Sequence, residues 1–375
     1  MWLQALSLTD FRSYQHVDLQ FTPGVTAFIG RNGQGKTNIV EAIAYLSTLG
    51  SHRVAHDAPL IRSGAGHAVV RARVVEEDRS VGVDVQINPS GSNKARINRA
   101  AATRARDILG IVRAIMFAPE DLALVRGDPS ERRRFLDEMT IQRHPRVSGV
   151  RSDYDKVLRQ RNALLKSAYG RADSTMRETL DAWNEQLIDL GTDLIRSRLE
   201  FTKDLTPLVQ KAYERVAGAA TVDIRYRPSS PSLQGIVSGH PATTTDISAA
   251  FTEDLHARID DELRRGVTLV GPHRDELELE LDGFPVKGYA SHGESWSMAL
   301  ALRLGAADVL RSDGVDPIII LDDVFAELDT ERRRHLAELA GSSTQVFITA
   351  AVEQDVPIEL DGARFHVVTG QVSAA

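Results

Sequence analysis

The sequence has 375 residues, of which 42% are hydrophobic and 26% charged, so it is long enough for two or three folded domains. It contains no cysteine, which excludes disulfides, thiolate catalysis and cysteine metal sites and suits a reducing compartment. The formal net charge of −7 gives no global sign of nucleic-acid binding, and no apolar run reaches the roughly 18 residues of a membrane span. We expect a cytoplasmic protein with no membrane partner.

The first motif in the chain is a glycine-rich turn in the segment FIGRNGQGKTN, Phe28 to Asn38. Its spacing fits G-x-x-x-x-G-K-[ST], a loop whose backbone N–H groups curl around a phosphate. A short apolar run, Val25 to Ile29, precedes the turn, and apolar residues at helical spacing follow it. We therefore predict a strand, a phosphate loop and a helix whose N-terminus favours an anion. The ATP-binding residues expected in this loop are Gly30, Arg31, Asn32, Gly33, Gln34, Gly35, Lys36, Thr37 and Asn38.

Two basic segments follow the phosphate loop. Lys94 to Arg106 holds five basic residues and no acid, and a run of three arginines begins at Arg132. A nucleic-acid backbone needs such clusters, because each neutralised phosphate releases counterions. The alternatives are a solvated face for the first segment and a helix with salt-bridged flanks for the second. The candidate DNA-contacting residues are Lys94, Arg96, Arg99, Arg104, Arg106, Arg132, Arg133 and Arg134.

The middle of the chain is predicted to be helical. Apolar residues from Leu180 to Leu194 recur in alternating steps of three and four, the spacing of a coiled-coil seam, and Pro207 is expected to break the helix. We predict a long helix from Ser174 to Leu205 that pairs with the basic stretch Tyr154 to Tyr169 in a short antiparallel arm. Ordinary helical core is the alternative interpretation of the seam.

A second anion site is predicted in the segment YASHGESWSMALALRLG, Tyr289 to Gly305. Ser291, Gly293 and Glu294 form S-x-G-E at the start of an apolar helical pattern. A serine hydroxyl, a glycine N–H and a helix N-terminus together suit a γ-phosphate. The S-x-G-E motif is weak by itself and gains meaning from its position in the chain.

Two consecutive aspartates complete the predicted site. The segment PIIILDDVFAELD, Pro317 to Asp329, has the apolar run of a central parallel strand and then Asp322 and Asp323. In the assigned roles, Lys36 reaches the β- and γ-phosphates, and Asp322 holds Mg²⁺ together with the Thr37 hydroxyl. Asp323 is placed to orient or deprotonate the attacking water. A buried strand that merely stops at a polar loop is the alternative.

Nearly the whole chain separates Lys36 from Asp322. The predicted fold is therefore an α/β P-loop ATPase head built from both chain ends, with a mostly helical inserted domain that carries a short antiparallel coiled arm. The expected boundaries are residues 1–118 for the N-terminal half with the phosphate loop, 119–267 for the helical insertion and 268–375 for the C-terminal half.

Taken in order, these motifs have the arrangement of ABC-type ATPase heads, and nearly the full chain resembles the RecF family of bacterial recombination mediators, which is related to the SMC and Rad50 heads. The segments that carry the resemblance are LTDFRSY (Leu8 to Tyr14), GRNGQGKTN (Gly30 to Asn38), FAPEDLALVRGDPSERRRFLD (Phe117 to Asp137), GPHRDELEL (Gly271 to Leu279) and LDDVFAELD (Leu321 to Asp329).

The resemblance implies an ATP-dependent homodimer in which two subunits sandwich two ATP molecules. Each ATP, with its Mg²⁺, would touch one subunit's phosphate loop and the partner's signature residues, here Ser291, Gly293 and Glu294. It also implies weak ATPase activity, binding of double-stranded DNA with a preference for junctions with single-stranded gaps, and action with RecO and RecR in loading the RecA recombinase. Arg12 matches a position from which related heads contact the nucleotide.

Four departures from the ABC pattern accompany the resemblance. The catalytic position holds Asp323 where a glutamate is usual, and two alanines, Ala350 and Ala351, stand where transporters place a switch histidine. The place of the glutamine loop is taken by Glu120 or Asp121. The signature continues G-E-S-W where many relatives have G-Q-Q-R.

Two other functions remain open from the residues. A small-molecule kinase would need an acceptor pocket, would act without dimerisation, and leaves the S-x-G-E motif unexplained. A transporter ATPase subunit would lack a coiled arm and would carry the glutamine and histidine loops.

Overall fold

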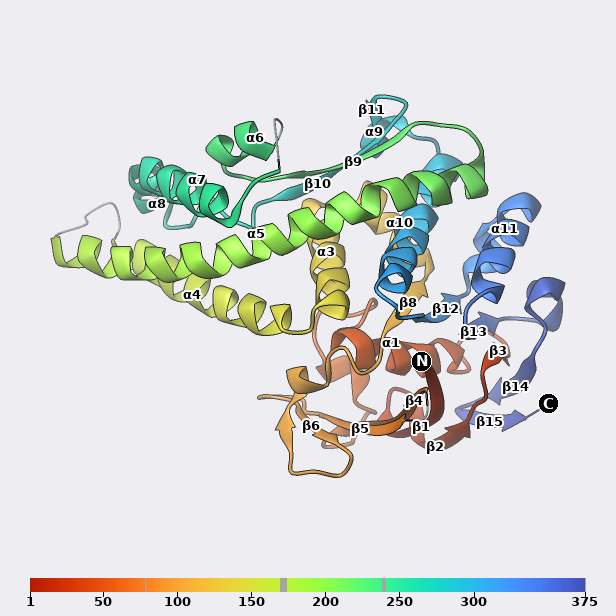
Figure 1. Ribbon diagram of the computed structural model, residues 1–375. Coiled ribbons are helices and arrows are strands. Elements are labelled where there is room, and N and C mark those ends of the chain that lie inside the picture. The colour runs from red at the N-terminus through yellow and green to blue at the C-terminus, as the bar shows by residue number, and fades with distance from the viewer. Residues whose placement is uncertain (78, 169–173, 238–240, 375) are drawn as a thin grey trace. The chain divides into compact units, whose positions relative to one another are not determined.

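The computed structural model describes residues 1–77, 79–168, 174–237 and 241–374 (Figure 1). The chain packs into two compact units. Unit 1 comprises Met1–Arg126, Pro207–Thr221 and Tyr289–Ala375, and unit 2 comprises Gly127–Thr206 and Val222–Gly288. Within the described ranges, no helix combines the length and the apolar character that crossing a membrane requires.

Unit 1 contains an antiparallel sheet of six strands in the order β2-β1-β4-β5-β6-β7. Apolar and polar residues alternate along its strands, so one face is buried and the other is polar. In β4, for example, Val70, Ala72 and Val74 are buried, whereas Arg71 and Arg73 are exposed. The strands are β1 Trp2–Phe11, β2 Tyr14–Gln20, β4 Ala68–Glu76, β5 Arg79–Ile87, β6 Lys94–Ile97 and β7 Thr103–Arg104.

The second sheet of unit 1 has the order β15-β14-β3-β13-β12-β8. Its strands are parallel except for the edge strand β15, which runs antiparallel to β14. The strand before the phosphate loop, β3, therefore lies between two strands from the C-terminal end of the chain. The strands are β3 Gly24–Ile29, β8 Ala114–Phe117, β12 Ile318–Asp322, β13 Gln345–Ala350, β14 Ala363–Val368 and β15 Gln371–Ala374.

A continuous apolar core joins the two sheets of unit 1 through helix α1, Lys36–Thr48. Leu6 of β1, Ile43 of α1 and Phe347 of β13 belong to this one core. The opposite face of the parallel sheet is also buried, and α10, His292–Ser312, packs against it at β8. The sheet is thus covered on both faces, as parallel sheets require. Two further helices of unit 1 are α2 Leu122–Arg126 and α11 Thr330–Gly341.

Unit 2 combines helices with a three-stranded antiparallel sheet of order β11-β10-β9, which the sequence analysis did not predict. Arg161 of α4 donates to Asn184 of α5 (2.8 Å), and Leu165 of α4 packs in one cluster with Leu180 of α5. Because the α5 number falls as the α4 number rises, the two helices run antiparallel. The elements are α3 Pro129–Arg143, α4 Val147–Ala168, α5 Ser174–Ala217, β9 Val222–Arg227, α6 Pro231–Val237, α7 Thr244–Ala257, α8 Ile259–Arg265, β10 Glu276–Leu281, β11 Phe284–Pro285 and α9 Val286–Tyr289. The part of α5 from Pro207 onward belongs to unit 1.

One sequence expectation about α5 is wrong. The helix does not break near Pro207 but continues to Ala217 (Figure 1). Proline removes one backbone hydrogen bond, yet Leu205 and Val209 on either side of it are fully buried. Packing of the apolar face therefore outweighs the local cost. Tyr169, the end of the predicted partner stretch, lies outside the described residues.

The contact-defined units divide the chain at residues 126/127, 206/207, 221/222 and 288/289. The predicted domain boundaries after residues 118 and 267 stay a prediction about independently folding domains.

Candidate functional site

The glycine-rich turn lies between β3 and α1, at the carboxyl edge of the parallel sheet. Gly33 and Gly35 have positive φ angles of 81° and 112°, which side chains other than glycine rarely adopt. At Gly30 the constraint is steric, because an added Cβ would lie 2.3 Å from the carbonyl oxygen of Val367. The turn is thus shaped by glycine at three positions, as a loop that curls its N–H groups around an anion requires.

Lys36 is folded into this turn and is only 3% exposed. Its Nζ donates to the carbonyl oxygens of Gly30 (2.6 Å) and Arg31 (3.3 Å) and to Oδ1 of Asn32 (3.4 Å). The ammonium group therefore stands within the turn, at the position where a bound phosphate would meet it.

The structure brings Thr37 and Asp322 together from the two ends of the chain. The Thr37 hydroxyl donates to Oδ1 of Asp322 at 3.0 Å, and the Thr349 hydroxyl of β13 donates to the same oxygen at 2.6 Å. Burial, reinforced by the neighbouring Asp323, raises the pKa of Asp322 to about 6. A hydroxyl and a carboxylate oxygen held side by side form a donor set that suits Mg²⁺, so the residues present fit this ion.

Asp323 occupies the turn directly after β12. Its φ of 50° is left-handed, a conformation that aspartate tolerates better than most residues. The turn is fixed because the Asp323 N–H donates to the Thr349 hydroxyl at 3.0 Å. The two aspartates are therefore oriented by one threonine from the neighbouring strand, and the sequence analysis did not identify that threonine.

Three more polar residues lie around the aspartates. His52, four residues beyond the end of α1, places Nε2 3.9 Å from Oδ2 of Asp322. Burial lowers the pKa of His52, while nearby carboxylates, of which Glu120 is the strongest, oppose that shift. Of the two candidates for the glutamine-loop place, Asp121 is buried and accepts two hydrogen bonds from Arg303 (3.1 and 2.7 Å), whereas Glu120 is exposed. His52 and His56 stand four residues apart in the sequence but match no H-E-x-x-H metal motif, so the sequence did not indicate this position for His52.

Arg12, predicted to contact the nucleotide, forms a two-bond ion pair with the buried Glu41 of α1 (2.8 and 2.6 Å). Its Nη1 also donates to the carbonyl oxygen of Pro59 at 3.1 Å. The side chain is 14% exposed. These contacts hold the β1–β2 turn against α1, and a contact between Arg12 and a nucleotide stays a prediction.

The turn between β14 and β15 supports the phosphate loop from the C-terminal side. The Thr369 N–H donates to Oε1 of Gln34 at 2.5 Å, and the Gly370 N–H donates to the Gln34 carbonyl oxygen at 3.2 Å. From the other side, the Tyr14 hydroxyl donates to the Gly35 carbonyl oxygen at 3.1 Å. No motif in the sequence indicated that the last hairpin holds the first loop.

The S-x-G-E segment begins α10, as predicted. Ser291 caps the helix: its hydroxyl accepts from the Glu294 N–H (3.2 Å), and Glu294 accepts from the Ser291 N–H (2.7 Å). Arg332 of α11 lies over Gly293, where an added Cβ would be 3.2 Å from the guanidinium. The structure therefore places a cation beside the helix N-terminus, although the Arg332 charge is paired with Asp329.

The first group of candidate DNA-contacting residues lies in unit 1, on the polar side of the antiparallel sheet. This face carries a concavity of about 710 Å³ that includes Arg99, and next to it a smaller one of about 190 Å³ that includes Lys94 and Arg96. Arg104 lies on β7 and is exposed, and Arg106 follows it in a short 3₁₀ turn.

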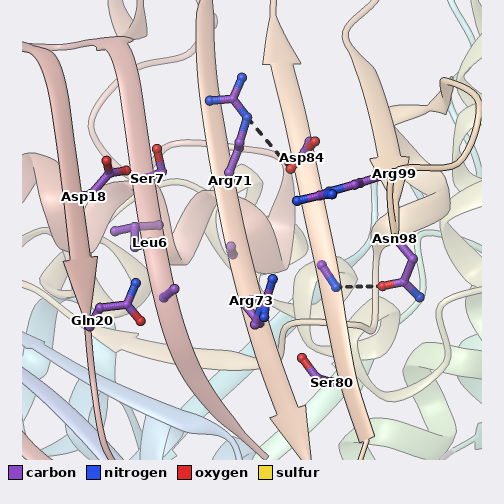
Figure 2. Close-up of a pocket in the computed structure, with 13 residues that line it drawn as sticks. Leu6, Ser7, Asp18, Gln20, Arg71, Arg73, Ser80, Asp84, Asn98 and Arg99 are labelled. Atoms are coloured by element: carbon purple, nitrogen blue, oxygen red, sulfur yellow. Dashed lines mark hydrogen bonds and ion pairs between the residues drawn. The ribbon is translucent and has the colours of Figure 1, made fainter.

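Two arginines of this face were missed by the sequence analysis. Arg71 and Arg73 project from β4 into the larger concavity, as Figure 2 shows, and Arg71 lies 4.0 Å from Asp84 of β5. The signal was present in VVRARVVE, Val69 to Glu76, where arginines alternate with buried apolar residues.

The second group, at the start of α3 in unit 2, supports the fold. Arg132 is 7% exposed and makes two hydrogen bonds to Glu276 (2.7 and 2.8 Å). Arg133 donates to the Asp275 carbonyl oxygen (2.8 Å), and Arg134 pairs with Glu131 (2.6 Å). This arrangement favours the alternative of a salt-bridged helix, and DNA contacts by these three residues stay a prediction.

The chain is similar to known proteins over nearly its full length. A family model described as RecF/RecN/SMC N terminal domain matches residues 2–362. A DNA replication and repair protein RecF of Streptomyces avermitilis is 53% identical over 379 residues, with 99% of each chain covered. A protein of the same name from a Nocardioides species is 51% identical over 422 residues, again with 99% of each chain covered.

Solved structures extend the likeness to the fold. Two structures of the recombination mediator protein RecF in the RecFOR pathway, one with ATP and one with ATPrS, are each 26% identical, with TM-scores of 0.90 and 0.89. They cover all of this chain, which in turn covers 97% and 98% of theirs. A Smc head domain from Pyrococcus furiosus bound to the C-terminal domain of ScpA is 16% identical with a TM-score of 0.55, over 100% of this chain and 96% of that one, and shows likeness of fold alone.

The predicted fold class, an ABC-type ATPase head with a helical insertion, is confirmed by these matches and by the two sheets that flank α1. The family model spans nearly the whole chain, and the relatives share about half of its residues. The chain therefore belongs to the RecF family.

Proposed function

We propose that the chain is an ATP-driven switch that binds double-stranded DNA and hydrolyses ATP slowly. Its relatives are named DNA replication and repair proteins, which gives the general setting. The single observation that supports the switch best is the hydrogen bond between Thr37 and Asp322, which joins residues 285 positions apart in sequence. The site is assembled from both chain ends. A change in the contacts around the nucleotide would therefore act on both the N-terminal and the C-terminal parts of unit 1.

Each residue of the site has a defined part in this proposal. Lys36 binds the β- and γ-phosphates, Thr37 and Asp322 hold Mg²⁺, and Asp323 orients or deprotonates the attacking water. When bound, the ion would neutralise charge on the phosphates. A carboxylate one methylene shorter than the usual glutamate suits slow turnover, which would act as a timer.

The signature residues give the proposal its dimeric form. Ser291 is exposed at the N-terminus of α10, where a partner's γ-phosphate would meet a hydroxyl, a glycine N–H and the helix dipole. A nucleotide shifts the equilibrium between open and closed states only if it binds the two states with different affinities, and a contact with the γ-phosphate is available to ATP but not to ADP. ATP would close the homodimer and its hydrolysis would open it.

The closed form is proposed to bind duplex DNA in the cytoplasm, with a preference for junctions with single-stranded gaps. The solved RecF structures are described as belonging to the RecFOR pathway, which supports RecR and RecO as partners in loading RecA. DNA contacts are assigned to the polar sheet face, with Lys94, Arg96 and Arg99 joined by Arg71 and Arg73. Such contacts touch the backbone and carry no sequence preference.

The mass of the protein in solution tests this function. We expect dimers with Mg²⁺ and ATP and monomers with ADP or without nucleotide. Lys36→Arg weakens phosphate binding and Ser291→Arg blocks the partner surface, so both variants should stay monomeric with ATP. If the mass is indifferent to nucleotide while ATP still binds, the sandwich is wrong, and a single-site kinase becomes the better account.

A further inference from the structure

His52 is a partly buried histidine to which the proposed mechanism assigns no part. It follows the phosphate-loop helix, and its Nε2 lies 3.9 Å from Oδ2 of Asp322, with side-chain exposures of 16% and 5%. This Nε2 is fully buried and has no hydrogen-bond partner among the described residues. A buried polar atom without a partner destabilises the folded state, so its retention needs an explanation.

The two oxygens of Asp322 are treated differently by their surroundings. Oδ1 accepts hydrogen bonds from Thr37 (3.0 Å) and Thr349 (2.6 Å). Oδ2 accepts none from the part of the chain that the structure describes, and His52 faces it. A separation of 3.9 Å is longer than a hydrogen bond, and a shift of about 1 Å would close it. Threonines therefore fix one oxygen, and among the described residues the His52 imidazole is the group in place to fix the other.

The end of the neighbouring strand supplies no imidazole. Ala350 closes β13 and Ala351 follows it, so the place at which ABC transporters carry a histidine has no polar side chain here. An imidazole reaches Asp322 instead from the loop after α1, where His52 lies. This loop directly follows α1, the helix that begins with Lys36 and Thr37, so His52 is a second link between the phosphate-loop helix and Asp322.

We propose that His52 is a positioning residue for ATP hydrolysis: its Nε2–H holds Oδ2 of Asp322 and so sets the orientation of Asp322 and of the adjoining Asp323. The inference rests on the proposed ATPase function. With both oxygens held, the carboxylate has one rotamer, and the Mg²⁺ ligand and the water-orienting residue stay in fixed register. Without the imidazole, Asp322 keeps the Thr37 and Thr349 contacts but gains rotational freedom.

Three variants test the inference. His52→Gln keeps an amide N–H near the position of Nε2. The side chain of His52→Asn is one methylene shorter, so its amide does not reach Asp322. His56→Asn is the matched control, because His56 lies on the same loop but is exposed. Measurements are the binding of a fluorescent ATP analogue with Mg²⁺ and with EDTA, the single-turnover rate of hydrolysis, and thermal unfolding without ligand.

We expect His52→Asn to lower the hydrolysis rate by about 10- to 100-fold, the size of effect that misplacement by 1 Å produces. The gain in analogue affinity on adding Mg²⁺ should shrink severalfold, whereas affinity in EDTA and the unfolding temperature should match those of His56→Asn. His52→Gln should recover most of both losses. This pattern separates positioning of Asp322 from a general structural role.

Other outcomes overturn one idea or the other. Equal rates and equal Mg²⁺ effects in His52→Asn and His56→Asn would remove His52 from the site. Loss of affinity in EDTA together with a lower unfolding temperature, with no recovery in His52→Gln, would make the residue structural only. If the wild-type protein binds no analogue at all, the proposed ATPase function fails before the role of His52 is reached.

Discussion

Asp323 combines an uncommon backbone with a central chemical role. Its left-handed φ of 50° turns the chain at the end of β12, and the N–H bond to Thr349 locks that turn. Backbone conformations of this kind persist where the surroundings over-determine them, and such positions cluster at functional sites. Asparagine tolerates the same conformation, so Asp323→Asn changes the charge and leaves the turn intact.

We expect Asp323→Asn to bind ATP normally and to hydrolyse it at least about 100-fold more slowly, because asparagine cannot accept the water's proton. A switch that cannot reset should also dissociate from duplex DNA more slowly. Rates of phosphate release and of DNA dissociation measure the two effects. Unchanged turnover in this variant would exclude Asp323 from the chemistry.

His273 in unit 2 makes stability depend on pH. Burial lowers its pKa from 6.5 to about 4, and its Nδ1 lies 2.7 Å from the Tyr154 hydroxyl. Below pH 6.5 the unfolded chain takes up a proton that the folded chain refuses until about pH 4, so stability is full above this window and falls as pH falls through it. The whole interval corresponds to about 3 kcal/mol.

The matching prediction is that wild type loses about 2 kcal/mol more than His273→Gln between pH 7 and pH 5, because glutamine does not titrate. Urea unfolding at both pH values measures the difference. Parallel losses in the two proteins would mean that His273 is protonated in the folded state.

At the level of single residues, the sequence predicted those whose chemistry follows a spaced motif. Lys36, Thr37 and Asp322 belong to this class, and the structure brings the last two into contact. Thr349 and His52 had no motif, because their importance comes from strands and loops that meet only in three dimensions. Local sequence patterns do not reveal such contacts between distant segments.

The polar face of the antiparallel sheet is the feature to test among the elements. Arg71 and Arg73 stand two positions apart on β4 and therefore point to the same side (Figure 2). If each contacts a DNA phosphate, Arg71→Ala and Arg73→Ala should each lower the slope of log K against log salt concentration by about one. Asp84→Asn should tighten binding, because it removes the carboxylate that lies 4.0 Å from Arg71.

Arg79→Ala is the control for this prediction. Arg79 is exposed on β5 but lies outside both concavities. The Arg79→Ala variant removes the same charge as the other two variants but should leave the slope of log K against log salt concentration unchanged. If all three arginine variants weaken binding equally, the effect is one of net charge and the face is not a contact surface.

The elements show where sequence patterns succeed and fail. The strand before the phosphate loop and the helix after it were predicted because their periods are clear, and both are present as β3 and α1. The break at Pro207 was wrong, since buried neighbours on both sides hold α5 together. The strands β9 and β10 were missed, although apolar and polar residues alternate along both VDIRYR and ELELEL, which is a local signal for a strand.

The whole of unit 1 depends on a pairing between chain ends. Strand β3 has β13 on one side and β14 on the other, so its backbone hydrogen bonds in the sheet form only with residues 345–368. A chain truncated after Thr344 should therefore lack nucleotide binding and show protease-sensitive residues 1–126. A chain truncated after Gly370 keeps both neighbours and should bind. Limited proteolysis and analogue binding decide between the two.

This large-scale arrangement was predictable in outline only. The distance between the glycine-rich turn and the aspartates required a site made from both ends, and the sheet order agrees. The support of Gln34 by the β14–β15 turn was not predictable, because it depends on which strand forms the edge.

The position of β3 between β13 and β14 also has a meaning for synthesis on the ribosome. At about 5–20 residues per second, the phosphate-loop strand emerges roughly 15 to 60 s before its first neighbour in the sheet. Throughout that delay the apolar strand β3 has no neighbouring strand in its sheet, so it would be available for binding by holdase chaperones. A polypeptide released before β14 is made lacks one neighbour of β3, so we expect only a chain translated through β14 to bind nucleotide.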